Sequence, residues 1–127
     1  MLQGWLREDG QAVVELEVVC RDGSSRTVPA ITDTGFNGQV SLSRRVVNEL
    51  DLPLTYEGTV EVELASGTLI EEAVYSGTIR FDGQELTAEI ILTDAEDIFI
   101  GTGLLIGKVL LINFVTREVT VRDHIPS

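Results

Sequence analysis

The chain has 127 residues, the size of one ordinary domain, and 43% of them are hydrophobic, so the sequence predicts a single folded domain over 1–127. Its 21 acidic and 9 basic residues leave a formal charge of −12, which repels phosphate backbones and argues against a nucleic-acid partner. Cys20 is the only cysteine, and the sequence has neither a secretory signal nor the roughly 20 apolar residues of a membrane span, so we expect a cytoplasmic protein without membrane contact.

Alternating apolar residues predict a β-hairpin near the N-terminus. In the first run, 12–20, every second residue is apolar, which is the period of a half-buried strand. A turn signal at 21–25 separates it from a second β-run, 26–32, and a short loop between two such runs favours a hairpin. The second run leads directly into Asp33.

The rest of the chain predicts one clear helix and further short strands. The helix covers 43–50, where Ser41 or Ser43 is in place to cap it and Pro53 prevents its continuation. The remaining elements are β-runs at 58–64, 68–81, 86–92 and 98–101, a helical turn near 104–106, and β-runs at 109–113 and 118–122. Many short strands with almost no helix predict an all-β fold, a small closed or partly closed β-barrel with one or two short helices.

The segment Ala30-Ile31-Thr32-Asp33-Thr34-Gly35 places a carboxylate at the end of an apolar run, where a charged group needs polar partners. Thr34 supplies a hydroxyl that can lock the loop, and Gly35 lets the backbone approach closely. Two carboxylates held about 3 Å apart share one proton, so one activates water while the other donates a hydrogen bond to the attacked carbonyl. The chain has a single Asp-Thr-Gly, so a second subunit would have to supply the other carboxylate across a twofold axis.

This triplet resembles the active-site triplet of retropepsin-like aspartic proteases, the proteases of clan AA. Residues 33–42 are similar to the small stand-alone prokaryotic members, in which Phe and Gly follow the triplet. The segment 98–105 resembles the two-apolars-then-Gly segment that threads beside the catalytic loop, and 62–74 occupy the place of the flap hairpin. The resemblance implies a single-lobe fold with a flap, a homodimer, an aspartic endopeptidase activity on a peptide or protein substrate, and no cofactor.

The resemblance also implies roles for individual residues. Asp33 would be the catalytic acid and base, Thr34 would brace the paired loops across the dimer axis, and Gly35 would shape the floor. The implied substrate-binding residues are Phe36 in the floor and Ala65, Ser66 and Gly67 at the flap tip. The implied structural residues beside the catalytic loop are Ile100 and Gly101. Phe36 is bulkier than the small residue that viral members have at this position.

Other functional interpretations fit the sequence less well. The glycines of 101–107 have the wrong spacing for a dinucleotide-binding turn, and too little chain follows them for a βαβ unit. His124 is the only histidine, so a Ser-His-Asp or Cys-His arrangement would depend on a terminal residue, and ligands for a zinc-type metal site are lacking. A different class of function stays open, a catalytically silent dimeric module that binds a peptide or protein on the same fold.

Overall fold

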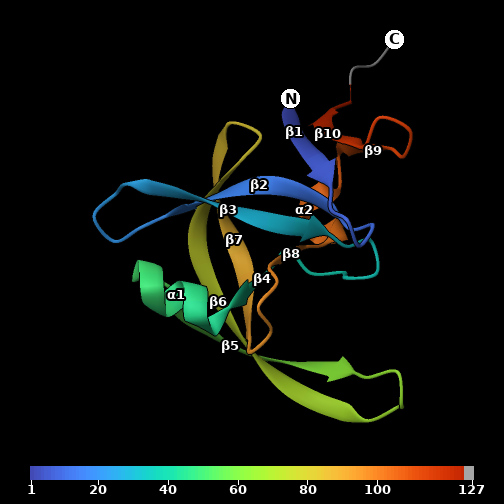
Figure 1. Ribbon diagram of the computed structural model, residues 1–127. Helices are drawn as coiled ribbons and strands as arrows, with labels where there is room; N and C mark the ends of the chain where they lie inside the picture. The colour runs from blue at the N-terminus through green and yellow to red at the C-terminus, as the bar shows by residue number, and fades with distance from the viewer. Residues whose placement is uncertain (125–127) are drawn as a thin grey trace.

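The computed structural model describes residues 1–124, which form ten strands and two short helices (Figure 1). In chain order these are β1 (Leu2–Leu6), β2 (Ala12–Val19), β3 (Ser25–Thr32), β4 (Val40–Ser43), α1 (Arg44–Leu50), β5 (Thr55–Glu63), β6 (Leu69–Phe81), β7 (Gln84–Thr93), β8 (Phe99–Ile100), α2 (Thr102–Leu105), β9 (Lys108–Asn113) and β10 (Glu118–Asp123). The molecule is therefore mostly β, as the sequence predicts, and no helix within 1–124 has the length and apolarity to cross a membrane.

Strands β2 and β3 form the predicted antiparallel hairpin, with Leu16 opposite Val28. Val14, Leu16 and Val18 are at most 1% exposed, because the alternation of the strand turns all three toward the core. The hairpin delivers the end of β3 to the place where the chain continues into Asp33.

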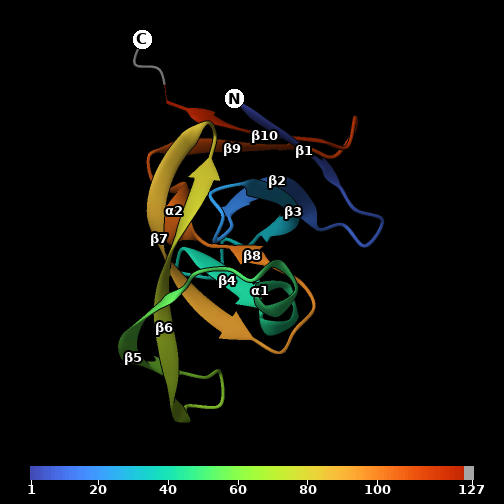
Figure 2. The same ribbon diagram turned by 90° about the vertical axis from the view of Figure 1, so that its left-hand side faces the viewer.

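The strands follow the order β5-β6-β7-β4-β8-β3-β2-β1-β10-β9, and an additional pairing of β6 with β2 joins two distant members of this order. That pairing closes β2, β3, β8, β4, β7 and β6 into a ring. One buried apolar cluster takes residues from every strand of the ring. Strands β1, β9 and β10 lie together across one end of it (Figure 2).

Two strands, β1 and β4, are missing from the sequence prediction. Strand β1 pairs with both β2 and β10, and Gly4 permits the close approach, since a Cβ at this position would lie 2.9 Å from Val14 Cγ1. Strand β4 has only four residues, all of them buried, and lies between a parallel neighbour, β7, and an antiparallel one, β8. A run this short gives too little alternation to be recognised as a strand.

The predicted helix is α1, whose apolar residues Val46, Val47 and Leu50 pack against the core from its outside. Ser43 occupies the position before the first helical residue, as one of the two expected caps, but its side chain makes no capping hydrogen bond. Asp51 ends the helix in the left-handed conformation, with φ of 49°. The helix is therefore held by its apolar face rather than by a side-chain cap.

Candidate active site

The loop that carries Asp33 begins where β3 leaves the sheet. The Asp33 N–H donates to the Ile100 carbonyl at 2.9 Å, and the Ile31 N–H donates to the Ile98 carbonyl at 2.8 Å. These bonds belong to the parallel pairing of β3 with β8, in which Thr32 lies opposite Ile100. The backbone of Asp33 is thus fixed by β8, which belongs to the segment that the family resemblance puts beside this loop.

The Asp33 side chain is half-buried and folds back on its own loop. Its Oδ1 accepts a hydrogen bond from the Gly35 N–H at 2.9 Å, and the Asp33 carbonyl accepts one from the Phe36 N–H at 3.2 Å. Within residues 1–124, Oδ2 accepts no hydrogen bond. The Thr34 hydroxyl is exposed and has no hydrogen-bond partner in the same range. One oxygen therefore holds the carboxylate in place, while the other is available to a ligand or to a second carboxylate.

The far side of the same loop is fastened to α2 and the residue before it. Three successive N–H groups, those of residues 101–103, donate to loop carbonyls at Gln39 (3.0 Å), Phe36 (2.8 Å) and Gly38 (3.0 Å). Gly101 packs against the loop so closely that a Cβ would lie 2.5 Å from the Phe36 carbonyl oxygen, so this position accepts no other residue without a shift of the backbone. The loop is held from both ends by one segment.

A cleft of about 630 Å³ separates this loop from hairpin β5–β6, and both project on the same side of the molecule in Figure 1. It is lined by the loop residues Asp33, Gly35, Phe36, Asn37 and Gly38, the sheet residues Ser41, Glu89, Ile91, Thr93 and Phe99, and the hairpin residues Val60, Val62, Glu63 and Glu72. The carboxylate of Asp33 therefore faces a space large enough for the side chains of a peptide.

The cleft floor follows from strand register. Ser41 of β4 pairs with Ile91 of β7 on one side and with Phe99 of β8 on the other, which puts the three side chains in one row. On β7 alternate residues point to opposite faces, so Ala88 and Ile90 are buried in the core while Ile91 lines the cleft. The sequence does not predict this row, because the direction in which these side chains point depends on the short strand β4.

The part of the hairpin that lines the cleft includes Val60 and Val62 and not the residues of the hairpin tip. Ala65, Ser66 and Gly67 form the exposed turn, closed by a hydrogen bond from the Gly67 N–H to the Leu64 carbonyl at 2.8 Å. None of these three tip residues lines the cleft within the described chain, so their contact with a substrate stays a prediction. The alternation of Val60 and Val62 is the signal that could have identified the cleft-facing residues.

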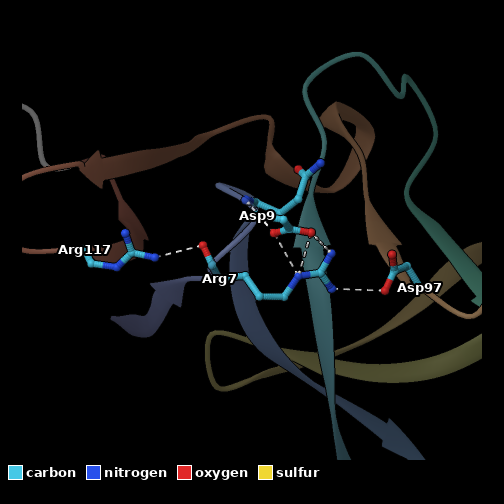
Figure 3. Close-up of polar contacts among 5 residues, drawn as sticks. Arg7, Asp9, Asp97 and Arg117 are labelled. Carbon is cyan, nitrogen blue, oxygen red and sulfur yellow. Dashed lines mark hydrogen bonds and ion pairs between the residues drawn. The ribbon is translucent and has the colours of Figure 1, made fainter.

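A polar cluster around Arg7 supports the strand that holds Asp33 (Figure 3). Arg7 Nη1 binds Asp97 Oδ1 at 3.1 Å, its Nε binds Asp9 Oδ1 at 3.0 Å, and Arg117 Nη2 donates to the Arg7 carbonyl at 2.9 Å. The hydrogen bonds with Asp9 and then Asp97 raise the pKa of Arg7, and the hydrogen bond with Arg7 lowers the pKa of Asp9. Because Asp97 directly precedes Ile98, the cluster joins the turn after β1 to the start of β8.

The other candidate residues lie away from the cleft. Cys20 is half-buried and packs against the core, and His124 is exposed beyond the end of β10. Residues 1–124 contain no group of three or more His, Cys, Asp or Glu side chains arranged to hold a metal ion.

Solved structures share this arrangement of strands. A retropepsin-like aspartic protease from Rickettsia conorii superposes with a TM-score of 0.64 and 15% identity, over 96% of this chain and 89% of that one. The chain has a retropepsin-like fold. The retropepsin-like fold also matches the EIAV protease complexed with the inhibitor HBY-793, with a TM-score of 0.57 and 15% identity, over 78% of this chain and 88% of that one. No protein-family model matches the sequence, and no curated protein matches it significantly.

Proposed function

We propose that this chain is an aspartic endopeptidase that acts as a homodimer, with the Asp33 carboxylates of two subunits as its catalytic pair. The observation that carries the proposal is the position of Asp33, held by hydrogen bonds on a loop at the edge of the 630 Å³ cleft. The retropepsin-like fold supports it, since both solved structures of that fold described above are proteases.

The composition of the cleft supports the proposal of two subunits. Asp33 is the only aspartate among the described residues that line it. A twofold axis beside the loop would bring a second Asp33 opposite the first, since an isologous contact places identical residues together. The exposed Thr34 hydroxyl, which has no partner within residues 1–124, would then brace the paired loops.

In this dimer the two carboxylates share one proton and hydrolyse a peptide bond without a cofactor. The ionised carboxylate takes a proton from water as the water oxygen attacks the carbonyl carbon, and the protonated one passes its proton to the carbonyl oxygen. The tetrahedral intermediate then reforms the carbonyl and breaks the C–N bond. The leaving nitrogen receives a proton from one carboxyl of the pair. The other carboxylate takes a proton from the hydroxyl that becomes the carbonyl oxygen, so the pair again holds one proton. Because one carboxyl must be protonated, the optimum is expected on the acid side of neutral.

The remaining site residues orient this pair and the substrate. Gly35 holds the carboxylate through its N–H, and Phe36 forms part of the cleft floor. Ile100 and Gly101 hold the catalytic loop, through the Asp33 N–H and the Gln39 carbonyl respectively. Ala65, Ser66 and Gly67 would close over a bound peptide from the hairpin tip.

The test is Asp33→Asn, assayed for turnover of an unfolded protein across pH while the oligomeric state is followed by sedimentation. Loss of turnover with an unchanged dimer is the expected result. Asp94→Asn is the matched control, because the Asp94 side chain is 94% exposed on a loop outside the cleft. Equal turnover by wild type and Asp33→Asn, or a chain that stays monomeric while it cleaves, contradicts the proposal.

A further inference from the structure

All the charged side chains that line the cleft are acidic. Besides Asp33 it is lined by Glu63, Glu72 and Glu89, and none of the nine Lys and Arg residues of the sequence is among its lining residues. Within residues 1–124, none of the three glutamates forms an ion pair, whereas six of the nine Lys and Arg residues pair with acids elsewhere. The site proposed above therefore faces its substrate with uncompensated negative charge.

Glu72 lies on the inner face of hairpin β5–β6. It is the cross-strand partner of Val60, and residues directly opposite each other in an antiparallel pair project to the same side. Since Val60 and Val62 line the cleft, this register turns the half-buried Glu72 toward the same space. Its neighbour Glu71 points to the outer face, where it is exposed opposite Glu61.

Glu89 approaches the cleft from the sheet. It lies two residues before Ile91 on β7, on the face that lines the cleft. Its N–H donates to Gln39 Oε1 at 2.6 Å, which fixes its backbone beside the catalytic loop. The cleft thus presents carboxylates from both the sheet and the hairpin, beside the apolar Val60, Val62 and Ile91.

We infer that the cleft selects peptides that carry an arginine or lysine side chain close to the cleaved bond; this rests on the proposed function. The long apolar stem of such a side chain matches the valine and isoleucine surfaces, while its charged end meets Glu72 or Glu89. A neutral peptide in the same position would cover these carboxylates without replacing their hydration. In a homodimer the twofold axis doubles the carboxylates, and the charge of −12 on each chain steers cationic peptides toward them.

The test uses two peptides that are identical except that one carries arginine and the other citrulline, which has nearly the same shape and no charge. For the wild type we expect kcat/KM to be about five to ten times higher with arginine at low ionic strength, and this ratio to shrink in about 0.5 M salt. Glu72→Gln should bring the ratio toward one. Glu71→Gln is the matched control, because it removes the same charge from the outer face of the same strand and should leave the ratio unchanged.

The outcomes separate this inference from the proposed function. Equal cleavage of both peptides by the wild type, or an equal fall in the ratio for Glu71→Gln and Glu72→Gln, overturns the inference and leaves the protease activity intact. If neither peptide is cleaved, the proposed function fails, and fluorescence anisotropy with the same labelled peptides decides the inference alone. Tighter binding of the arginine peptide that Glu72→Gln abolishes supports it, and equal or absent binding overturns it.

Discussion

The ring of Phe36 fills the space beside Gly38, so that a Cβ built on Gly38 would lie 2.6 Å from both Cε1 and Cζ of the ring. The crowding atoms belong to a side chain and not to the backbone, so the ring alone excludes a larger residue. Phe36 also lines the cleft, and its position therefore links the sequence of the loop to the shape of the cleft floor.

A double-mutant cycle tests this contact. Gly38→Ala should lower the free energy of unfolding by about 1–3 kcal/mol, the usual cost of inserting a methyl group into a packed site. In a Phe36→Ala background the same change should cost little, because the ring is gone, which gives a coupling of at least about 1 kcal/mol. Urea unfolding of the wild type, both single variants and the double variant measures it. Additive losses would mean that the ring can move aside.

Gly101→Ala should behave differently, because its Cβ would meet the carbonyl oxygen of Phe36 at 2.5 Å as well as the ring. The backbone cannot withdraw without losing the hydrogen bonds that hold the loop. We expect a loss of about 3 kcal/mol that Phe36→Ala does not recover, together with loss of activity. Gly103→Ala is the comparison, since its Cβ meets loop atoms at 3.0 Å and should cost less. The same urea experiment gives the order of the two variants.

Gly67 tests the conformation of the hairpin tip. Its φ is 85°, and nothing lies within 4 Å of a Cβ at this position, so a substitution acts through backbone strain alone. Gly67→Ala should cost about 1 kcal/mol and increase amide hydrogen exchange at the tip. Gly67→Asn should cost less, because asparagine tolerates the left-handed region. If both variants exchange as the wild type does, the turn is not fixed by this residue.

The pairing of Asp82 predicts a pH dependence of stability. Its side chain is 5% exposed, and the ammonium group of Met1, followed by Lys108, lowers its pKa below the ordinary 3.8. A lowered pKa in the folded state stabilises the protein above the unfolded value, and this contribution disappears as the pH falls through the folded value. Asp82→Asn should therefore lower the urea midpoint at pH 7, with the difference shrinking as the pH falls below the ordinary value of 3.8. Asp94→Asn, on an exposed loop, should leave the midpoint nearly unchanged at both pH values.

The sequence predicts those parts of the fold whose partners are close along the chain. The alternation of Val14, Leu16 and Val18 identified hairpin β2–β3, and the neighbouring β-runs at 68–81 and 86–92 correspond to the paired strands β6 and β7. Strand β1 was not predicted because its five residues, with Gly4 in the middle, give little apolar alternation, although it pairs with the neighbouring β2. Its other partner, β10, lies more than a hundred residues away, as in the pairing of Leu2 with Val121. Local pattern carries no information on such a contact.

The candidate site likewise contains residues that the sequence predicts and residues that only the fold brings together. Asp33 stood out because Asp-Thr-Gly follows an apolar run, and Gly101 because the glycine follows two apolar residues. The sequence could not place Ser41, Ile91 and Phe99 in one row, because that row exists only through the parallel and antiparallel pairings of β4. The acids of the cleft were equally hidden, since Glu71 and Glu72 differ only in the face to which the register turns them.

The 13-residue strand β6 belongs to the ring at one end and to the hairpin at the other. Its pairing with β7 stops at Val74, and beyond this residue only β5 accompanies it to the tip. At the same level β5 has a bulge between Tyr56 and Gly58, where the φ of Gly58 is 121°. The outer half of the hairpin is thus joined to the ring only through the residues around Gly58 and Val74, and a rotation about these residues would change the width of the cleft mouth without disturbing the pairings of the ring.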